Sequence, residues 1–344
     1  MTTRVVTETN SMPTAHYTKV VHVAVAVIER FSASGVREIL ISKRAADAHQ
    51  GGLWEFPGGK VEALETVQVA LSRELNEELG LTLDLTREPL YPLIQIQHDY
   101  DDKSVLLDVF VVTEFSGTPH GREGQPVRWV PVTELESYDF PVANKSILSA
   151  CQLPGRLAIT PSVNGLSEAR AALHHLCKEG ISHVILRQPA WTIEQYFTRA
   201  SLLVSEFEST GLTIMLHGDP ADLDDIDAVY IHLPSSAAKR YMTLDNYPGR
   251  RFGMSCHDQA ELDHARGLGV QFATLSPVAA TNSHPGANAM GWARFTQLVS
   301  TFNIPVFALG GMSDSDLSQA RQNGAQGIAA ISAWAAAPPS ADNK

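Results

Sequence analysis

Cysteine is scarce in this chain of 344 residues, which contains only Cys151, Cys177 and Cys256 and no CxxC pair. A disulfide-stabilised secreted scaffold or a cysteine-ligated zinc site requires more cysteines at closer spacing. We therefore expect core or incidental thiols in a reducing cytosol, and we predict a cytoplasmic protein.

Long apolar runs and excess positive charge are also missing. The chain starts with a polar stretch, and the apolar run VVHVAVAVI that follows it is only as long as one strand. We therefore expect neither a signal peptide nor a membrane span. The net charge of -12 argues against binding of duplex nucleic acid, because affinity for its phosphates comes mainly from Lys and Arg. A free nucleotide held through a metal ion is compatible with this charge.

The remaining composition is that of an ordinary globular protein, with 44% hydrophobic and 19% charged residues. Its length exceeds that of a typical single domain, so two domains are expected. We predict folded domains at 19–152 and 157–334, and disordered ends at 1–18 and 335–344.

The stretch GGKVEALETVQVALSRELNEELGL, at 58–81, predicts a glycine loop followed by a helix that ends at Gly80. At about 100° per residue, one helix face is apolar and the adjoining arc is acidic. The apolar stripe comprises Val67, Leu71, Leu75 and Leu79, and the acidic arc comprises Glu74, Glu77 and Glu78. Three carboxylates on one helix edge either form a solvated acidic face or hold a cation. Oxygen ligands of this kind favour Mg²⁺ or Mn²⁺, which suit phosphate substrates.

Every position of the pattern GX5EX7REUXEEXGU is filled here, where U is an aliphatic residue, and the stretch resembles the Nudix box. That family hydrolyses nucleoside diphosphates linked to another group, with a divalent metal held by the box glutamates. The resemblance implies that the three glutamates of the acidic arc are metal ligands and that the Gly58 carbonyl is a further ligand. Gly59, Glu65 and Arg73 are the structural positions of the box. Arg73 is expected to pair with Glu65 and, one helical turn later, with Glu77.

The flanking motifs RAADAH, LWEFPGGKVE, GREGQPVRW and DFPVANK resemble the MutT branch of this family, the 8-oxo-dGTP diphosphatases. The resemblance covers about residues 20–152 and implies a Nudix fold, a mixed sheet between helices. It also implies that Glu123 is an additional metal ligand or base, and that the Asn144 amide reads the purine edge. An amide donates and accepts at once, so it matches O6 and N7–H of an 8-oxopurine, whereas guanine N7 carries no proton. The alternative role for Asn144 is a helix N-cap.

Three more residues are assigned to the nucleotide site. Arg44, at a strand end, is either a phosphate clamp or a solvated charge. Phe56 either packs beneath the base or belongs to the core, and His49 in RAADAH is placed with them. We expect Glu74 to be the general base, with Glu77 and Glu123 as rivals. Attack at the β phosphorus, as in the enzymes that this half resembles, would yield a nucleoside monophosphate and pyrophosphate.

Beyond residue 155 the pattern changes to short apolar runs separated by helical segments, which predicts a compact (β/α)8 barrel in an α/β protein. The eight runs are 157–160, 183–187, 212–217, 228–233, 251–256, 271–276, 305–309 and 327–332. Gly310 and Gly311 follow the seventh run, where they form either a phosphate loop or a tight turn.

This second half resembles thiamine-phosphate synthase and its TenI-like relatives, most clearly in HVILRQ, MSCHD, LSPVAAT and PVFALGGMSDSDL. Several functional positions depart from that pattern. Arg187 is retained, but His217-Gly218 replaces an Asn-Asp pair, Ala237 replaces an aspartate, and a lysine after the sixth strand is missing. We therefore expect a barrel that binds a ligand or stabilises the protein, and not a working synthase.

Three hypotheses follow. The leading one is a Mg²⁺-dependent hydrolase that removes 8-oxo-dGTP from the nucleotide pool. The second is hydrolysis of thiamine-type pyrophosphates, which have no use for the purine-reading amide of Asn144. The third is a barrel that senses a phosphorylated metabolite and regulates the first half, which the intact box disfavours. Nothing in the sequence identifies a protein partner.

Overall fold

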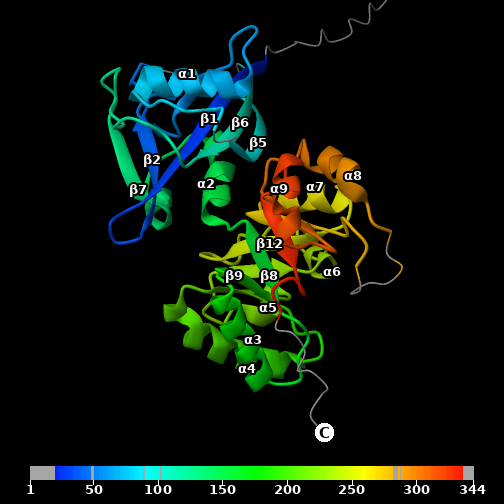
Figure 1. Cartoon of the computed structure of the whole chain (residues 1–344). Coiled ribbons are helices and arrows are strands. Elements are labelled where there is room, and N and C mark those ends of the chain that lie inside the picture. The colour runs from blue at the N-terminus through cyan, green and yellow to red at the C-terminus, as the bar shows by residue number, and fades with distance from the viewer. Residues whose placement is uncertain are drawn as a thin grey trace, which may run out of the picture.

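The computed structural model describes residues 20–47, 50–87, 90–100, 103–281, 286 and 288–335. An N-terminal unit built on a sheet is followed by a C-terminal barrel (Figure 1). The elements of the first unit are β1 (Val20–Phe31), β2 (Arg37–Lys43), β3 (Trp54–Glu55), β4 (Gly58–Lys60), α1 (Val67–Leu79), β5 (Tyr91–Asp99), β6 (Ser104–Val112), β7 (Val127–Pro131), η1 (Val132–Ser137), η2 (Val142–Asn144) and α2 (Lys145–Gln152).

The N-terminal sheet is mixed. Its strand order is β3-β2-β1-β6-β5, with β4 paired to β1 and β7 paired to β2. Strands β1 and β6 run parallel, whereas the other pairs are antiparallel. Successive residues of β1 face opposite sides, so Ala24 and Ala26 join the core beneath α1, while Val25 and Val27 join the core beside α2. The predicted mixed sheet between helices is confirmed.

Helix α1 begins and ends where the sequence predicts. The Thr66 hydroxyl accepts a hydrogen bond from the Val69 amide, and Gly80 adopts the left-handed conformation at φ 71°. Leu71, Leu75 and Leu79 are fully buried against the sheet. This packing fixes the rotation of the helix and places its acidic arc beside β4.

Residues 156–330 form a closed barrel of eight parallel strands, as predicted. Each of the eight apolar runs contains one strand. The strands are β8 (Arg156–Ile159), β9 (His183–Leu186), β10 (Thr213–His217), β11 (Tyr230–Leu233), β12 (Arg251–Cys256), β13 (Phe272–Leu275), β14 (Val306–Leu309) and β15 (Gly327–Ala330). The helices are α3 (Leu166–Lys178), α4 (Ile193–Phe207), η3 (Glu208–Thr210), α5 (Pro220–Leu223), α6 (Ser235–Ala238), α7 (Gln259–Leu268), α8 (Gly291–Val299), η4 (Asp314–Asp316) and α9 (Leu317–Gln322).

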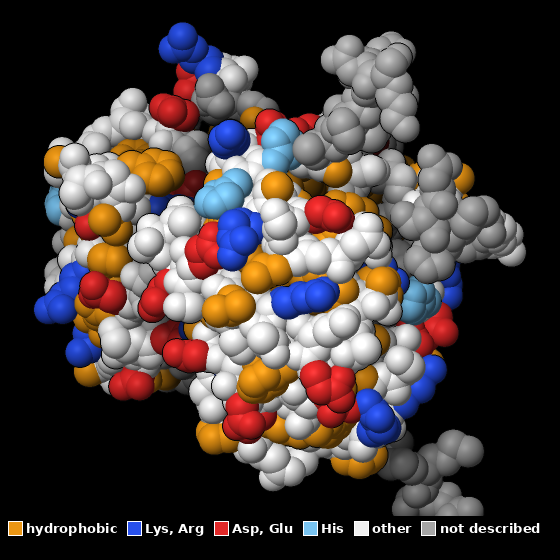
Figure 2. Space-filling model, turned by 90° about the horizontal axis from the view of Figure 1, so that it is seen from below, with side chains coloured by type: hydrophobic (Ala, Val, Ile, Leu, Met, Phe, Trp, Pro, Cys, Tyr) orange, Lys and Arg blue, Asp and Glu red, His pale blue; other side chains and the backbone are white. Residues whose placement is uncertain are grey.

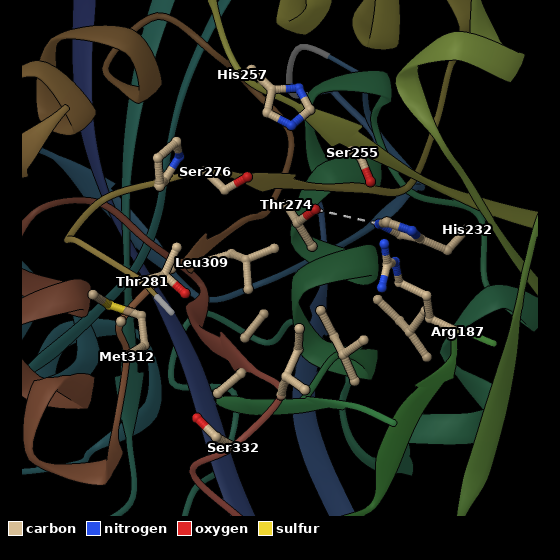
Figure 3. Close-up of a pocket in the computed structure, with 18 of the residues that line it drawn as sticks. Arg187, His232, Ser255, His257, Thr274, Ser276, Thr281, Leu309, Met312 and Ser332 are labelled. Carbon is tan, nitrogen blue, oxygen red and sulfur yellow. Dashed lines mark hydrogen bonds between the residues drawn. The ribbon is translucent and has the colours of Figure 1, made fainter. Parts of the chain in front are cut away.

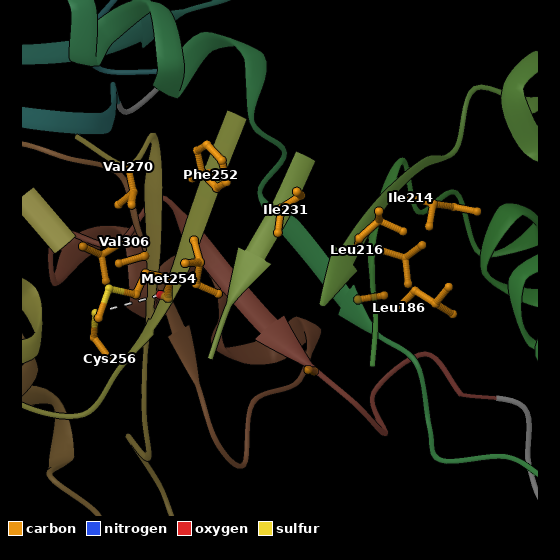
Figure 4. Close-up of a cluster of buried hydrophobic side chains, with 14 of the residues drawn as sticks. Leu186, Ile214, Leu216, Ile231, Phe252, Met254, Cys256, Val270 and Val306 are labelled. Atoms are coloured by element: carbon orange, nitrogen blue, oxygen red, sulfur yellow. Dashed lines mark hydrogen bonds between the residues drawn. The ribbon is translucent and has the colours of Figure 1, made fainter. Parts of the chain in front are cut away.

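Two layers of apolar side chains hold the barrel together. Inside the strands, Tyr230, Phe272 and Phe307 fill the lumen with smaller aliphatic residues. Outside them, residues such as Leu216 and Met254 belong to the large cluster between the strands and the helices (Figure 4). The lumen is therefore a packed core at this level and not a pore.

The floor of the barrel, at the N-terminal ends of its strands, contacts the first unit. Arg251 donates to Glu136 over 2.6 Å, and the Gln326 amide nitrogen donates to the Ala150 and Leu153 carbonyls over 3.0 and 3.2 Å. The Asn303 side chain pairs with both backbone groups of Gln97, at 2.9 and 2.5 Å, and so satisfies an edge position of β5. The opposite end of the barrel, at the C-terminal ends of its strands, is not covered by these contacts.

No helix in the described part of the chain is long and apolar enough to cross a membrane. Figure 2, which views the molecule from below, shows acidic, basic and apolar side chains interspersed on that face and no broad basic patch.

Replacing Asn303 by Ala is expected to loosen the junction. The substitution removes both hydrogen bonds to Gln97, each worth about 1 kcal/mol. Amide hydrogen exchange at Gln97 should accelerate by about tenfold. The matched control Asn288→Ala, at an exposed position, should leave that rate unchanged. An unaltered Gln97 rate in Asn303→Ala would show that the junction does not depend on this pair.

Candidate active site and barrel pocket

Four carboxylates influence one another at one edge of the N-terminal sheet. Glu74 and Glu78 come from α1, Glu55 from β3, and Glu123 from the loop before β7. Burial, together with the nearby charges of Glu55, Glu74 and Glu123, raises the pKa of Glu78 to about 8, against the hydrogen bond from the Gly58 amide. The site therefore disfavours negative charge at Glu78 in the absence of a cation.

Arg73 organises the neighbouring box residues. Its guanidinium donates to both oxygens of Glu65, at 2.8 and 3.0 Å, and to the Lys60 carbonyl at 3.1 Å. It also donates to Glu74 at 2.9 Å and to Glu77 at 3.2 Å. The guanidinium lowers the pKa of Glu65 to about 2. The structure thus contains both ion pairs that the sequence predicts for Arg73.

Both box glycines are closely packed, Gly58 against the backbone of β1 and Gly59 against the movable end of the Glu74 side chain. A Cβ atom on Gly59 would lie 2.1 Å from the carboxyl carbon of Glu74. Gly58 has a φ of +147°, and a Cβ there would lie 2.1 Å from the Ala24 carbonyl oxygen. Strand β4 therefore passes against β1 on one side and against the acidic arc of α1 on the other.

The loop that carries Glu123 is tied to the end of α1. The Arg122 amide and the Gln125 side chain both donate to the Glu78 carbonyl, at 2.9 and 3.1 Å. These bonds bring Glu123, 45 positions after Glu78 in the numbering, into the electrostatic field of the box. Glu123 is exposed, and its carboxylate has no hydrogen bond or ion pair within the described part of the chain.

The donor set suits a hard divalent cation, because carboxylate oxygens crowd around a group whose ionisation is disfavoured without one. Within the described residues, no three acidic, histidine or cysteine side chains are yet grouped closely enough to hold an ion. Glu74 and Glu77 instead bind Arg73. Rotation of these side chains away from Arg73 is therefore needed before they can join Glu78 as ligands.

Arg44 forms an ion pair with Glu55 at the ends of β2 and β3. Burial raises the pKa of Glu55, and Arg44 lowers it. Glu55 was missed by the sequence analysis, although it lies within the LWEFPGG motif that carries the resemblance. The pair holds the Arg44 guanidinium next to Glu55, one of the carboxylates that act on Glu78. His49, assigned to the same site, lies outside the described residues.

The predicted purine-reading segment lies beside β3. The Trp54 amide donates to the Asp139 carbonyl at 2.8 Å, and Phe56 stacks on Phe140 with ring centroids 5.2 Å apart. Phe56 is only 3% exposed, so its side chain has the core role, the second of the two expected roles. Phe140 is half-buried, so it lies nearer to the surface than Phe56. The sequence analysis did not single out this second aromatic residue.

Asn144 ends η2 and directly precedes α2. It is half-buried, and its side chain makes no capping hydrogen bond to that helix. No other described residue bonds its amide. The N-cap role is thus not realised by its side chain, and the amide is available to a ligand.

The barrel holds a cavity of about 710 Å³ at the C-terminal ends of its strands. Arg187, His232, Ser255, His257 and Thr274 surround it (Figure 3). The lining contains no Asp or Glu among the described residues, so it offers no carboxylate to a metal ion. The acidic residues that the sequence lacks relative to the synthase pattern are thus also absent from the described lining, which does not suit a magnesium ion.

Two neutral histidines, His217 and His232, line one side of this cavity. The Nδ1 atoms of His217 and His232 are 3.2 Å apart, and His232 Nε2 lies 3.4 Å from the Thr274 hydroxyl. Burial, followed by the charge of Arg187, lowers the pKa of His217 to about 4. Burial also lowers the pKa of His232 well below its ordinary value. Among the described lining residues, Arg187 is the one Arg or Lys side chain, and its charge acts on the nearby His217.

Gly310 and Gly311 line the same cavity at φ values of +101° and +69°. A Cβ on Gly310 would lie 2.9 Å from Pro277, and one on Gly311 would lie 2.6 Å from the Ala280 carbonyl oxygen. The tight turn alone explains both glycines, and a phosphate role for them stays a prediction.

Replacing Glu78 by Gln is expected to stabilise the metal-free protein at alkaline pH. Because the pKa of Glu78 is raised from 4.5 to about 8, the folded state holds this proton more tightly than the unfolded chain. Its contribution to stability is therefore lost as the pH rises from 4.5 through about 8. Gln avoids this loss, so its unfolding free energy in EDTA should exceed that of the wild type at about pH 9 by roughly 1–4 kcal/mol.

The two proteins should unfold alike at about pH 4.5, where Glu78 is protonated in the folded wild type. Adding Mg²⁺ at alkaline pH should reverse the order, because only the wild type supplies the charged ligand. Glu62→Gln, at an exposed position, is the control. Parallel pH profiles of wild type and Glu78→Gln in EDTA would contradict the proposed burial of Glu78.

Comparison with known proteins agrees with both halves of this description. Residues 25–150 match the NUDIX domain family, and residues 157–334, about half of the chain, match the thiamine monophosphate synthase family. The 8-oxo-dGTP diphosphatase of Escherichia coli is 38% identical over 112 residues, which covers 33% of this chain and 84% of that protein. The CTP pyrophosphohydrolase of Escherichia coli is 34% identical over 132 residues, which covers 38% and 91%.

The second half has its own relative. The putative thiamine-phosphate synthase 2 of Aquifex aeolicus is 28% identical over 185 residues, which covers 53% of this chain and 97% of that protein. Each half therefore matches nearly the whole of a separate protein. This chain belongs to the Nudix family through its N-terminal half and to the thiamine monophosphate synthase family through its C-terminal half.

Proposed function

We propose that the Nudix half hydrolyses 8-oxo-dGTP to 8-oxo-dGMP and pyrophosphate with a divalent metal, Mg²⁺ in the first instance, and so cleans the nucleotide pool. The observation that supports this most is the Asn144 amide. It is half-buried, it is unbonded within the described residues, and it lies on the segment that packs against the strand carrying Glu55. The relative named 8-oxo-dGTP diphosphatase supports the same substrate.

Base recognition is assigned to Asn144 and Phe140. The amide of Asn144 donates to O6 of the 8-oxopurine and accepts from N7–H. Guanine lacks the N7 proton, so the same orientation leaves one hydrogen bond unmade. Phe140, supported from below by Phe56, offers an aromatic face to the base.

The metal is assigned to Glu74, Glu77, Glu78, Glu123 and the Gly58 carbonyl. When bound, a divalent ion neutralises phosphate charge and lowers the pKa of a coordinated water. Once Glu74 and Glu77 leave Arg73, the bidentate pair with Glu65 keeps the guanidinium in place. Arg44, held by Glu55, is assigned to the phosphates.

Hydrolysis then requires a base and an in-line water. Glu74 is the proposed base, with Glu77 and Glu123 as the alternatives, and it accepts the proton of the attacking water. The water oxygen bonds to the β phosphorus, and the bond between that phosphorus and the bridging oxygen of the α phosphate breaks. The products are the nucleoside monophosphate and pyrophosphate.

Thiamine-type pyrophosphates are the second candidate substrates, because this hydrolase is joined to a barrel of the thiamine monophosphate synthase family. A purine-reading amide is of no use to such a substrate. We assign to the barrel the binding of a ligand, and not synthesis, because the lining of its cavity includes no described Asp or Glu. A barrel that regulates the Nudix half is the remaining alternative.

Steady-state hydrolysis by the full-length protein with Mg²⁺ tests the substrate. We expect 8-oxo-dGTP to be preferred over dGTP, CTP, ADP-ribose and thiamine pyrophosphate in kcat/KM. Glu74→Gln should lower kcat by on the order of 10²–10⁴-fold, whereas the exposed control Glu62→Gln should retain it. Preference for CTP or thiamine pyrophosphate would refute the substrate while leaving the hydrolase intact.

Replacing Asn144 by Ala should reduce discrimination between 8-oxo-dGTP and dGTP. Only the hydrogen bond from N7–H distinguishes the two substrates, so its loss predicts a drop of roughly tenfold in the ratio of their kcat/KM values. Loss of the bond to O6 should lower kcat/KM for both substrates alike. Retention of the full ratio in Asn144→Ala would place purine recognition elsewhere.

A further inference from the structure

A second cavity of about 220 Å³ lies between the two halves of the chain. The Nudix half contributes β5 and β6, including Leu93 and Phe110, and the barrel contributes α8 and α9 with the segments that follow them. It is separate from the box carboxylates and from the cavity at the other end of the barrel, with which it shares no lining residue in the described chain. We call it the interdomain cleft.

Arg321, in the last turn of α9, brings a positive charge to this cleft. Its guanidinium lies 6.0 Å from the centroid of the Tyr91 ring, and a Cβ on Gly155 would come within 2.6 Å of its Nη2. No hydrogen bond or ion pair joins it to any described residue. Glu29 attracts it electrostatically, but the hydrogen bonds of Glu29 are made with Arg37.

A half-buried guanidinium without a carboxylate partner is unfavourable, because burial removes part of the hydration of its five N–H donors. Burial accordingly lowers the pKa of Arg321. A planar carboxylate satisfies two of these donors at once, in a bidentate pair.

Gln326 supplies a complementary acceptor. It is 5% exposed and lines the cleft just before β15. Its Nε2 is fixed by the Ala150 and Leu153 carbonyls at 3.0 and 3.2 Å, which also fixes the orientation of the amide. The Oε1 atom of Gln326 is buried, and it has no hydrogen-bond partner within the described chain. It requires a donor, such as a hydroxyl group.

The rest of the cleft limits what else the ligand can be. Asp108 is already engaged through both oxygens, by His22 at 2.5 Å and by Gln95 at 2.6 Å. Apolar side chains such as Val299 and Phe302 supply much of the remaining wall. A single guanidinium within apolar walls favours one negative charge over the two of a phosphate monoester. The volume is below the roughly 300–1,000 Å³ of sites for drug-sized ligands.

We propose that the interdomain cleft binds a small hydroxy acid, with its carboxylate on Arg321, its hydroxyl on Gln326 and its apolar body between the two halves. Such a ligand bridges the sheet of the Nudix half and the floor of the barrel. The barrel binds its polar groups, through Arg321 on α9 and Gln326 before β15, and its apolar body packs against β5 and β6 of the Nudix half, so it favours the docked arrangement of the two halves.

Calorimetric titration of the full-length protein with 4-hydroxybenzoate tests the site. One molecule per chain should bind. Benzoate, which lacks the hydroxyl, should bind several-fold more weakly, and uncharged 4-hydroxybenzyl alcohol at least tenfold more weakly. Arg321→Gln should weaken the binding of 4-hydroxybenzoate at least tenfold, and Arg321→Lys should weaken it less. The matched control Arg294→Gln, on α8 outside the cleft, should bind as the wild type does.

Arg187→Gln separates this cleft from the cavity at the other end of the barrel. It should leave the titration unchanged if the cleft is the site. Amide hydrogen exchange of the wild type gives a readout that needs no variant. Saturating 4-hydroxybenzoate should protect 92–97 and 321–326, and not 274–281. Absence of saturable binding, full binding by Arg321→Gln, loss of binding in Arg187→Gln, or protection confined to 274–281 would each overturn the proposal.

Discussion

The local structure of the Nudix site depends on the crowding of carboxylates around the half-buried Glu78. Burial and three neighbouring acids all oppose its ionisation. Arg73 offsets part of this repulsion by binding Glu65, Glu74 and Glu77 at once. The same crowding brings the Glu74 carboxylate against Gly59, while Gly58 is required by its φ of +147° and its approach to the Ala24 carbonyl oxygen. The Nudix box thus describes a folded arrangement that concentrates carboxylates around one carboxyl group whose ionisation is disfavoured.

The barrel has the opposite electrostatic character. Its C-terminal cavity combines Arg187 with histidines that burial keeps neutral, and its described lining contains no acid. Its floor contacts the Nudix half through Arg251, Asn303 and Gln326, all near the N-terminal ends of strands. The cavity therefore opens away from the hydrolase. The contacts between the two halves are made at the barrel floor, at the end opposite this cavity.

Local pattern predicted most of the fold. The apolar stripe and the terminal glycine of α1 are properties of neighbouring residues, and the eight barrel strands are short apolar runs, so both could be read directly. Glu55 and Phe140 could not be identified in this way, because their proposed roles depend on contacts between β3 and residues about 85 positions later in the chain. The pairing of Gln97 with Asn303 spans 206 positions and carries no local signal. The assignment of Phe56 remained open for the same reason, since stacking on Phe140 decides it.

The position of Asn144 shows why the barrel matters to the hydrolase. Its side chain does not cap α2, so its orientation depends on the helix that follows being held by other contacts. Gln326 binds the carbonyls at the end of α2, and Arg251 binds both Gln152 in that helix and Glu136 before Asn144. The barrel floor therefore fixes the segment on both sides of the proposed purine contact. The relatives that match the first half align with only about a third of this chain, so they have no counterpart of these contacts in that alignment. We therefore expect the barrel to contribute to the geometry of the proposed nucleotide site.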